Sequence, residues 1–192
     1  MSGTYPTTPV FNAVNFTSQY FNLSSETISG RIQVRNIGGQ RFSFSANYPP
    51  MTRSEFQPVS AFIIKQRGMA ETFTIVLPEV SEASGTASGT LAANGTGSIG
   101  ATSIAVDGIT GTLKAGDMIK FANHNKAYMI TADLSGPGTL EFEPALISAV
   151  ALDEVITYDN VPFTVRLSND VQEFGVATDL TYSYEVDFVE AI

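Results

Sequence analysis

Few side chains in this sequence have the type and spacing that catalysis or metal binding requires. The only histidine, His124, lies in the polar turn Asn123-His124-Asn125. A metal site needs several ligands and a general base needs an orienting partner, so we predict that this residue is solvated. Cysteine is absent, which excludes disulfides, thiolate catalysis and cysteine-based metal sites, and leaves no sign of an oxidising compartment.

Two pairs of carboxylates stand close in the sequence, Glu141 with Glu143 and Asp153 with Glu154. On a strand, Glu141 and Glu143 share one face, as the carboxylates of a glycosidase or a calcium site do. The pattern favours the solvent side of an amphipathic strand, because no calcium-loop motif accompanies it. Gly95-Thr96-Gly97 resembles a fragment of a phosphate loop but lacks the downstream lysine. The sequence therefore predicts no catalytic residue, no metal and no cofactor, which argues against an enzyme.

Charge is unevenly distributed along the chain. The 192 residues include 10 basic and 19 acidic side chains, for a net charge of −9. Residues 1–88 have a net charge of +1 and residues 89–192 have −10. Such an acidic chain does not neutralise phosphates, which excludes wrapping of DNA or RNA. We predict that Arg31, Arg35 and Arg53, in the basic half, contact acidic surface on a neighbouring subunit.

Alternation of apolar and polar residues, the pattern of half-buried strands, dominates the chain. Residues 31–35 and 41–48 alternate on either side of Gly38-Gly39. Paired glycines supply the positive φ of a tight turn, so we predict a β-hairpin that turns at these glycines. Further strands are predicted at residues 71–77, 162–167 and 180–188. The last of them carries aromatic residues on one face, and we expect it to pair with the Phe42/Phe44 face of the hairpin.

One segment has helical spacing instead. Thr52–Glu55 matches a capping box, and the apolar residues Phe56, Val59, Phe62 and Ile63 follow it. Pro58 is best tolerated in a first helical turn, and Gly68 stands where a glycine stop is expected. We predict one helix at about residues 54–67.

The amino-acid composition changes after residue 80. Residues 81–100 are almost entirely Ser, Gly, Ala, Thr and Asn, which predicts a flexible connection. Short strand signals then follow at residues 103–106, 118–121, 127–131 and 139–142, a spacing typical of a small barrel or sandwich. We therefore predict a β-sandwich body made of residues 1–80 and 158–192, and an inserted small β domain at residues 89–152 that folds independently.

The N-terminal segment, residues 1–10, is polar and contains prolines, so we predict that it is disordered or docked on a neighbouring subunit. It lacks the basic start and apolar stretch of a signal peptide. No apolar run approaches the roughly 18 residues of a membrane span. We expect a soluble protein that is not inserted into a membrane and is assembled in a cytoplasm.

Several segments resemble structural proteins at the tail tip or baseplate of tailed bacteriophages. In those proteins a Pro-Pro-Met-Thr turn leads into a helix and an Arg-Gly turn leads into a Thr-Phe strand, as Asn47–Phe56 and Gln66–Phe73 do here. Parts of the insert resemble a phage tail module, and the C-terminal residues fit the same family: Gly111–Phe121, Tyr128–Thr131, Leu140–Leu146 and Tyr184–Ile192. The resemblance covers about two thirds of the chain.

This resemblance implies a fold and a function. The fold is all-β with one helix: a tail-tube-like β-sandwich flanked by an α-helix, with the β module inserted. The function is that of a virion structural protein, a ring-forming subunit of the tail tip or baseplate, most often a hexamer. Its partners are copies of itself and other tail proteins, and DNA passes through the ring without specific binding, which an acidic lumen favours.

A second hypothesis belongs to a different class. Small β modules with exposed aromatic side chains bind glycans, which makes a carbohydrate-binding adhesin module of the phage tail the alternative function. Tyr128 is its best candidate residue, although the alternation of Tyr128 with Ile130 favours a position in the core.

Overall fold

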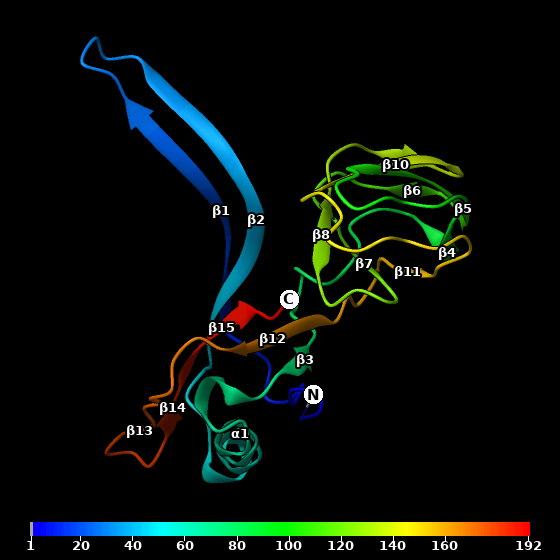
Figure 1. Ribbon diagram of the computed structural model, residues 1–192. Coiled ribbons are helices and arrows are strands. Elements are labelled where there is room, and N and C mark those ends of the chain that lie inside the picture. The colour runs from blue at the N-terminus through cyan, green and yellow to red at the C-terminus, as the bar shows by residue number, and fades with distance from the viewer. Residues whose placement is uncertain (1) are drawn as a thin grey trace.

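The structure is a computed structural model that describes residues 2–192 (Figure 1). Two β-rich regions lie side by side. One is a five-stranded sheet with a helix packed on it, which we call the body, and the other is a six-stranded barrel that is almost closed. Helix α1 (Arg53–Lys65) is the only α-helix within residues 2–192, beside one short 3-10 turn at Gly68–Ala70. The predicted all-β class with one helix is confirmed.

The body sheet is antiparallel, with the strand order β1-β2-β15-β12-β3. Its strands are β1 (Ala13–Glu26), β2 (Ile32–Asn47), β3 (Phe73–Ile75), β12 (Phe163–Leu167) and β15 (Glu185–Glu190). The expected pairing of the C-terminal strand is confirmed, because Phe188 of β15 lies opposite Phe44 of β2. A two-stranded ribbon, β13 (Gly175–Val176) with β14 (Tyr182–Ser183), precedes β15.

Helix α1 covers the inner face of the body sheet. Phe56, Val59 and Ile63 face the sheet and are buried, at the spacing of one helix face. The layer opposite the sheet is therefore a helix with loops, where a sandwich would have a second sheet. The start of the helix is fixed by Glu55, whose carboxylate accepts hydrogen bonds from the Thr52 N–H (2.8 Å) and the Thr52 hydroxyl (2.7 Å). Pro58 lies in the second turn, not the first.

The predicted hairpin at Gly38-Gly39 is wrong. β2 runs without a turn from Ile32 to Asn47, and its partner is β1, a strand that the sequence analysis did not predict. The two glycines form a bulge, because the register shifts between Tyr20 and Asn22. Both glycines have positive φ, 82° and 79°, which a bulge requires as much as a tight turn does.

The barrel has the strand order β11-β7-β8-β10-β5-β4. A bridge between Ala92 and Val155 draws the two ends of this sheet together. Its strands are β4 (Ser88–Ala93), β5 (Ser103–Thr110), β7 (Met118–Phe121), β8 (Ala127–Ile130), β10 (Gly138–Glu143) and β11 (Ile156–Thr157), with a short pair of β6 (Thr112–Leu113) and β9 (Leu134–Ser135) beside them. The four strands predicted in this region are present at their expected positions.

The expectation of a flexible connection at residues 81–100 is wrong. β4 lies inside this segment, and its Leu91 and Ala93 are fully buried in the barrel core. Ser81 is also buried, and its carbonyl accepts a hydrogen bond from the Val161 N–H at 2.9 Å. A segment made mostly of small polar residues therefore forms an edge strand of the barrel. Its two buried apolar side chains, Leu91 and Ala93, hold it against the barrel core.

The N-terminal segment is neither disordered nor docked elsewhere over residues 2–5, and Met1 lies outside the described residues. The Tyr5 N–H donates to the Thr74 carbonyl at 2.8 Å, and the Thr74 N–H donates to the Gly3 carbonyl at 3.0 Å. Tyr5 itself is buried between Phe62, Phe73 and Phe188. The segment thus covers the β3 edge of the sheet. Its backbone pairs with an edge that would otherwise lack hydrogen-bond partners, and the Tyr5 ring packs among the three phenylalanine rings.

Candidate interaction site: a projecting arm and an acidic groove

The distal half of the β1–β2 pair projects from the body, as the blue ribbon of Figure 1 shows. We call residues 19–39 the arm, and every one of them is exposed. Its large apolar side chains have between 42% and 110% of their surface exposed: Tyr20, Phe21, Leu23, Ile28, Ile32, Val34 and Ile37. So many exposed apolar side chains on one segment make the arm a candidate interaction surface.

The arm is apolar on both faces. Side chains alternate along a strand, so Tyr20 lies on the same face as Phe16, which packs against the body core. Phe21 and Leu23 lie on the opposite face. A two-stranded ribbon is only marginally stable in water, and burial of the apolar side chains on either face would stabilise it.

The tip of the arm is a tight turn at residues 27–31. The Thr27 N–H donates to the Arg31 carbonyl (3.0 Å), and the Gly30 N–H donates to the Thr27 carbonyl (2.8 Å). Gly30 has a φ of 77°, a conformation that favours glycine. Ile28 is the outermost apolar side chain here, and it is completely exposed.

The structure separates the three arginines predicted as inter-subunit contacts. Arg31 and Arg35 lie on the arm and are exposed, while Arg53 is the first residue of α1, at the opposite end of the molecule from the arm tip (Figure 1). None of the three forms an ion pair with another residue in the range 2–192. Arg31 and Arg35 therefore belong to one surface and Arg53 to another.

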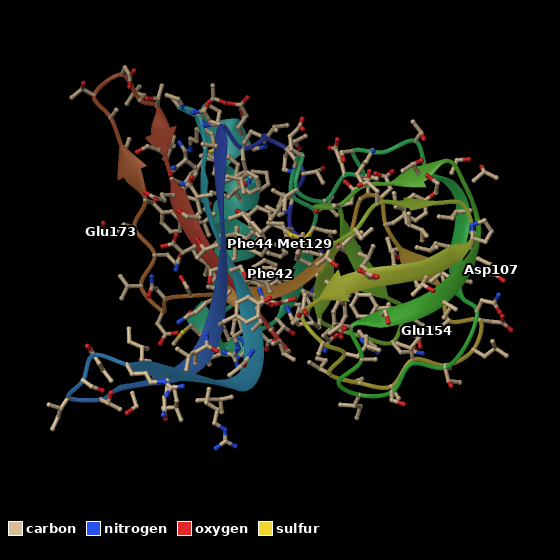
Figure 2. The ribbon with its side chains drawn as sticks, turned by 90° about the horizontal axis from the view of Figure 1, so that it is seen from above. Phe42, Phe44, Asp107, Met129, Glu154 and Glu173 are labelled. Carbon is tan, nitrogen blue, oxygen red and sulfur yellow. The ribbon has the colours of Figure 1, made fainter. Side chains whose placement is uncertain are left out.

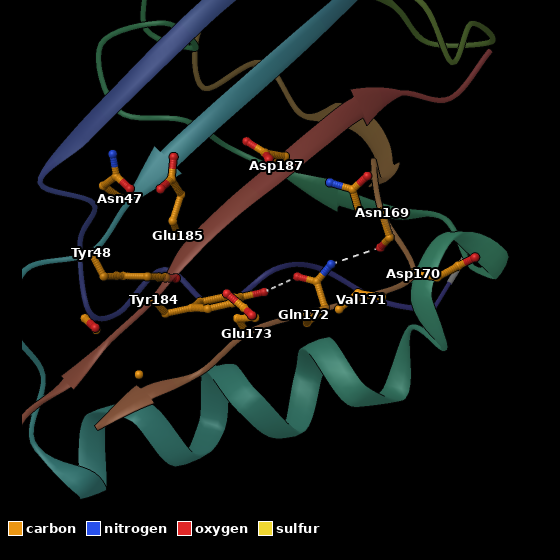
Figure 3. Close-up of a pocket in the computed structure, with 12 residues that line it drawn as sticks. Asn47, Tyr48, Asn169, Asp170, Val171, Gln172, Glu173, Tyr184, Glu185 and Asp187 are labelled. Carbon is orange, nitrogen blue, oxygen red and sulfur yellow. Dashed lines mark hydrogen bonds between the residues drawn. The ribbon is translucent and has the colours of Figure 1, made fainter. Parts of the chain in front are cut away.

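A groove of about 830 Å³ lies on the outer face of the body sheet (Figure 3). One wall is the loop of residues 169–173, between β12 and β13, and the other is formed by β15 and the end of β2. Four carboxylates line it: Asp170, Glu173, Glu185 and Asp187. Glu185 and Asp187 alternate with buried residues of β15, which turns both toward the groove. The groove is therefore strongly acidic.

Hydrogen bonds hold the wall of the groove in place. The Tyr184 hydroxyl donates to the Gln172 side-chain oxygen at 2.6 Å, and the Gln172 amide donates to the Asn169 carbonyl at 2.9 Å (Figure 3). Burial raises the pKa of Tyr184 above its ordinary value and raises that of Tyr48 to about 12. Both phenols thus remain neutral at physiological pH, and the charge of the groove comes from its carboxylates.

A buried ion pair joins the barrel to the body, and the sequence analysis did not predict it. Lys126, next to β8, contacts Glu190 of β15, and both side chains are fully buried. The Glu190 carboxylate also accepts the N–H groups of Ala127 (2.8 Å) and Phe42 (3.2 Å). Figure 2 shows Phe42 and Met129 at this boundary, and Met129 packs against the body core. The Lys126 ammonium lies 4.2 Å from the centre of the Phe42 ring.

A second lysine reinforces the same contact. The Lys120 ammonium, on β7, donates to the Pro162 carbonyl (2.9 Å) and the Thr164 hydroxyl (2.8 Å) at the start of β12. Burial lowers the pKa of both Lys120 and Lys126, while the charge of Glu190 opposes that shift. The barrel is thus fastened to the sheet that carries the arm and the groove.

The prediction of a solvated His124 is wrong. His124 is only 4% exposed, and its Nδ1 lies 2.8 Å from the Tyr128 hydroxyl. The turn that carries it folds back onto the barrel core, where the ring packs against Phe121. Tyr128 is fully buried, as its alternation with Ile130 indicates, so it offers no exposed ring to a sugar. The residue on which the adhesin hypothesis depends is therefore part of the core.

Of the two carboxylate pairs, only Glu154 has a structural role among the described residues. Glu141 and Glu143 are exposed on β10, on the solvent side, as predicted. Glu154 is buried and accepts the N–H groups of Asn123 (3.0 Å) and Ala151 (3.1 Å), while Asp153 is exposed. Within residues 2–192, no three His, Asp or Glu side chains lie close enough together to hold a metal ion.

No known protein-family model and no curated protein matches this sequence. No helix in the described part of the chain has the length and apolar character needed to cross a membrane.

Proposed function

We propose that this protein is a virion structural protein, a ring-forming subunit of a bacteriophage tail tip or baseplate. The observation that carries the proposal is the arm, whose exposed apolar side chains and two arginines need a partner surface that its own copy does not provide. A subunit with one projecting surface and a separate receiving surface associates head to tail. Such contacts close into a ring when the rotation between neighbouring subunits returns to the first subunit after a whole number of copies.

The positions of the phage-like segments support the same proposal. The Pro49-Pro50-Met51-Thr52 turn leads directly into α1, and the Arg67-Gly68 turn leads into β3. These are the connections that the resemblance implies. The proposed ring is a hexamer in the virion, in contact with other tail proteins. DNA passes through it without specific binding, which suits a chain with a net charge of −9.

Self-association through the arm is the first test. Ile32→Ser/Val34→Ser removes two apolar side chains from the arm without touching the core, since both are more than 60% exposed in the structure. We expect the apparent dissociation constant of the purified protein, from sedimentation equilibrium, to rise at least about tenfold. The matched control is Ile99→Ser, an equally exposed residue on the barrel, which should leave association unchanged.

The number of copies in the particle is the second test. A reconstruction of the phage tail by cryo-EM should show this chain as a closed ring on the tail axis. A single copy, or an appendage away from the axis, would contradict the ring and favour the adhesin.

For the first test, equal self-association of the Ile32→Ser/Val34→Ser variant and the wild type would show that the arm is not the contact.

A further inference from the structure

The acidic groove has a complementary surface on the same chain, namely the tip of the arm. We propose that the groove of one copy receives the arm tip of a second copy, with Arg31 and Arg35 against its carboxylates and Ile28 against Val171. The proposal rests on the proposed function, because it names the two surfaces through which copies associate. It does not depend on the number of copies in the ring.

Charge complementarity is the first argument. Residues 13–47, which form β1, β2 and their turn, contain three arginines and one glutamate, so this segment has a net charge of +2 and the rest of the chain has −11. Arg31 and Arg35 form no ion pair within residues 2–192. A guanidinium group binds carboxylates through paired hydrogen bonds. The basic arm therefore fits an acidic surface, and a second copy of this chain supplies one.

The state of the groove carboxylates is the second argument. Asp170 accepts the Met69 N–H (2.9 Å) and Glu185 accepts the Ser45 hydroxyl (3.2 Å), and no groove carboxylate makes an ion pair with a residue in the described range. Carboxylates held side by side repel one another, and a bound cation relieves that repulsion. Val171, at the groove wall, is 79% exposed and offers an apolar contact to Ile28.

The geometry requires two copies. The arm tip and the β13–β14 ribbon beside the groove lie at opposite ends of the body sheet (Figure 1), so an arm does not reach its own groove. The groove volume of about 830 Å³ is within the range of pockets that hold a small ligand, about 300–1,000 Å³. The groove can therefore hold the turn at the arm tip, residues 27–31, together with the Arg35 side chain. The rest of the arm spans the gap between the two copies.

Disulfide trapping tests the contact directly, because the natural chain has no cysteine. Two single-cysteine proteins are mixed under mild oxidation, one with Ile28→Cys on the arm tip and one with Glu173→Cys in the groove. We expect the mixed disulfide dimer to form at least about tenfold faster than with Glu141→Cys, an equally exposed position on the barrel. Equal rates at the two positions would overturn the proposal.

Charge exchange tests the same contact without a new bond. Arg31→Glu/Arg35→Glu and Glu185→Lys/Asp187→Lys should each weaken self-association about tenfold or more, and the protein that carries all four changes should recover it. Glu141→Lys/Asp153→Lys, on exposed barrel residues and with the same change of net charge as the groove variant, is the control. All the changed side chains are exposed, so thermal unfolding should confirm that each variant folds.

The outcomes separate this proposal from the function on which it rests. One outcome is that Arg31→Glu/Arg35→Glu weakens association while Glu185→Lys/Asp187→Lys does not, and another is that the protein with all four changes fails to recover association. Either result shows that the groove is not the receiving surface, and it leaves the proposed ring function standing. If a basic segment of another tail protein is trapped in the groove in place of the arm, the proposal is also overturned. If none of the arm variants changes association, the arm is not the contact and this proposal is overturned, whereas the ring is decided separately by the number of copies in the particle.

Discussion

The buried pair of Lys126 and Glu190 tests how firmly the barrel is held on the body. Both side chains are fully buried, and Glu190 also accepts two backbone N–H groups. Lys126→Met keeps an apolar stem of similar length and removes the ammonium group. The Glu190 carboxylate then stays buried without its ion-pair partner, which is an unfavourable state for a charge inside a protein.

The expected loss of stability is large. Removal of one partner of a buried ion pair costs about 3–5 kcal/mol. For a chain of this size, 1 kcal/mol corresponds to about 2–4 °C in melting temperature, so Tm should fall by about 6–20 °C. Lys126→Met/Glu190→Gln should recover part of the loss, because the neutral amide oxygen still accepts the backbone N–H groups and no charge is buried. We expect a coupling energy of at least about 2 kcal/mol between the two sites.

The assay is urea unfolding of the wild type, the two single variants and the double variant, followed by circular dichroism. Lys114→Met is the matched control, since Lys114 forms an ion pair with Asp133 at 2.6 Å in which both side chains are about half exposed. Exposed pairs contribute only about 0–1 kcal/mol. If Lys126→Met destabilises no more than Lys114→Met, or if the two single effects add within about 0.5 kcal/mol, the reasoning is refuted.

Three further predictions concern the core, the alkaline limit of stability and the insert. Phe188→Ala should cost about 3–5 kcal/mol in urea unfolding, because Phe188 is fully buried, whereas Val189→Ala on the outer face should cost much less. Burial raises the pKa of Tyr128 to about 12. The neutral Tyr128 phenol therefore contributes its full share to the stability of the fold below about pH 10, and this share is lost as the pH rises through about 12. Tyr128→Phe should make the fall of Tm between these pH values less steep. Replacement of residues 82–160 by a short Gly/Ser link should leave a folded body by circular dichroism, because the Ser81 carbonyl and the Val161 N–H are 2.9 Å apart, and aggregation would contradict the independence of the insert.

Local patterns in the sequence were enough to predict most of the elements. A capping box and helical spacing placed α1 at residues 54–67, against Arg53–Lys65 in the structure. Alternation placed β12, because burial of one face of a strand imposes a period of two on its residues, and short strand signals at regular spacing placed the barrel strands. The same argument identified Phe188 and Tyr128 as core residues.

The candidate site was accessible from sequence only in part. Charge counting singled out Arg31 and Arg35, but it grouped them with Arg53, which lies at the far end of the molecule. Strand β1 was missed, although Val14 and Phe16 alternate with polar residues there. Without β1 the arm could not be predicted. The groove was also missed, because its carboxylates come from a loop and from a strand that meet only in the folded chain.

The sequence alone determined several core residues, among them Phe188 and Tyr128, because burial of one face of a strand leaves a local periodic signal. Tertiary structure alone decided what each strand pairs with. Gly38 and Gly39 satisfy a tight turn or a bulge equally well, and only the presence of β1 opposite β2 selects the bulge. In the same way, Lys126 and Glu190 lie 64 residues apart and carry no local sign of their pairing. Their burial follows from the docking of the barrel on the sheet, which no short-range pattern encodes.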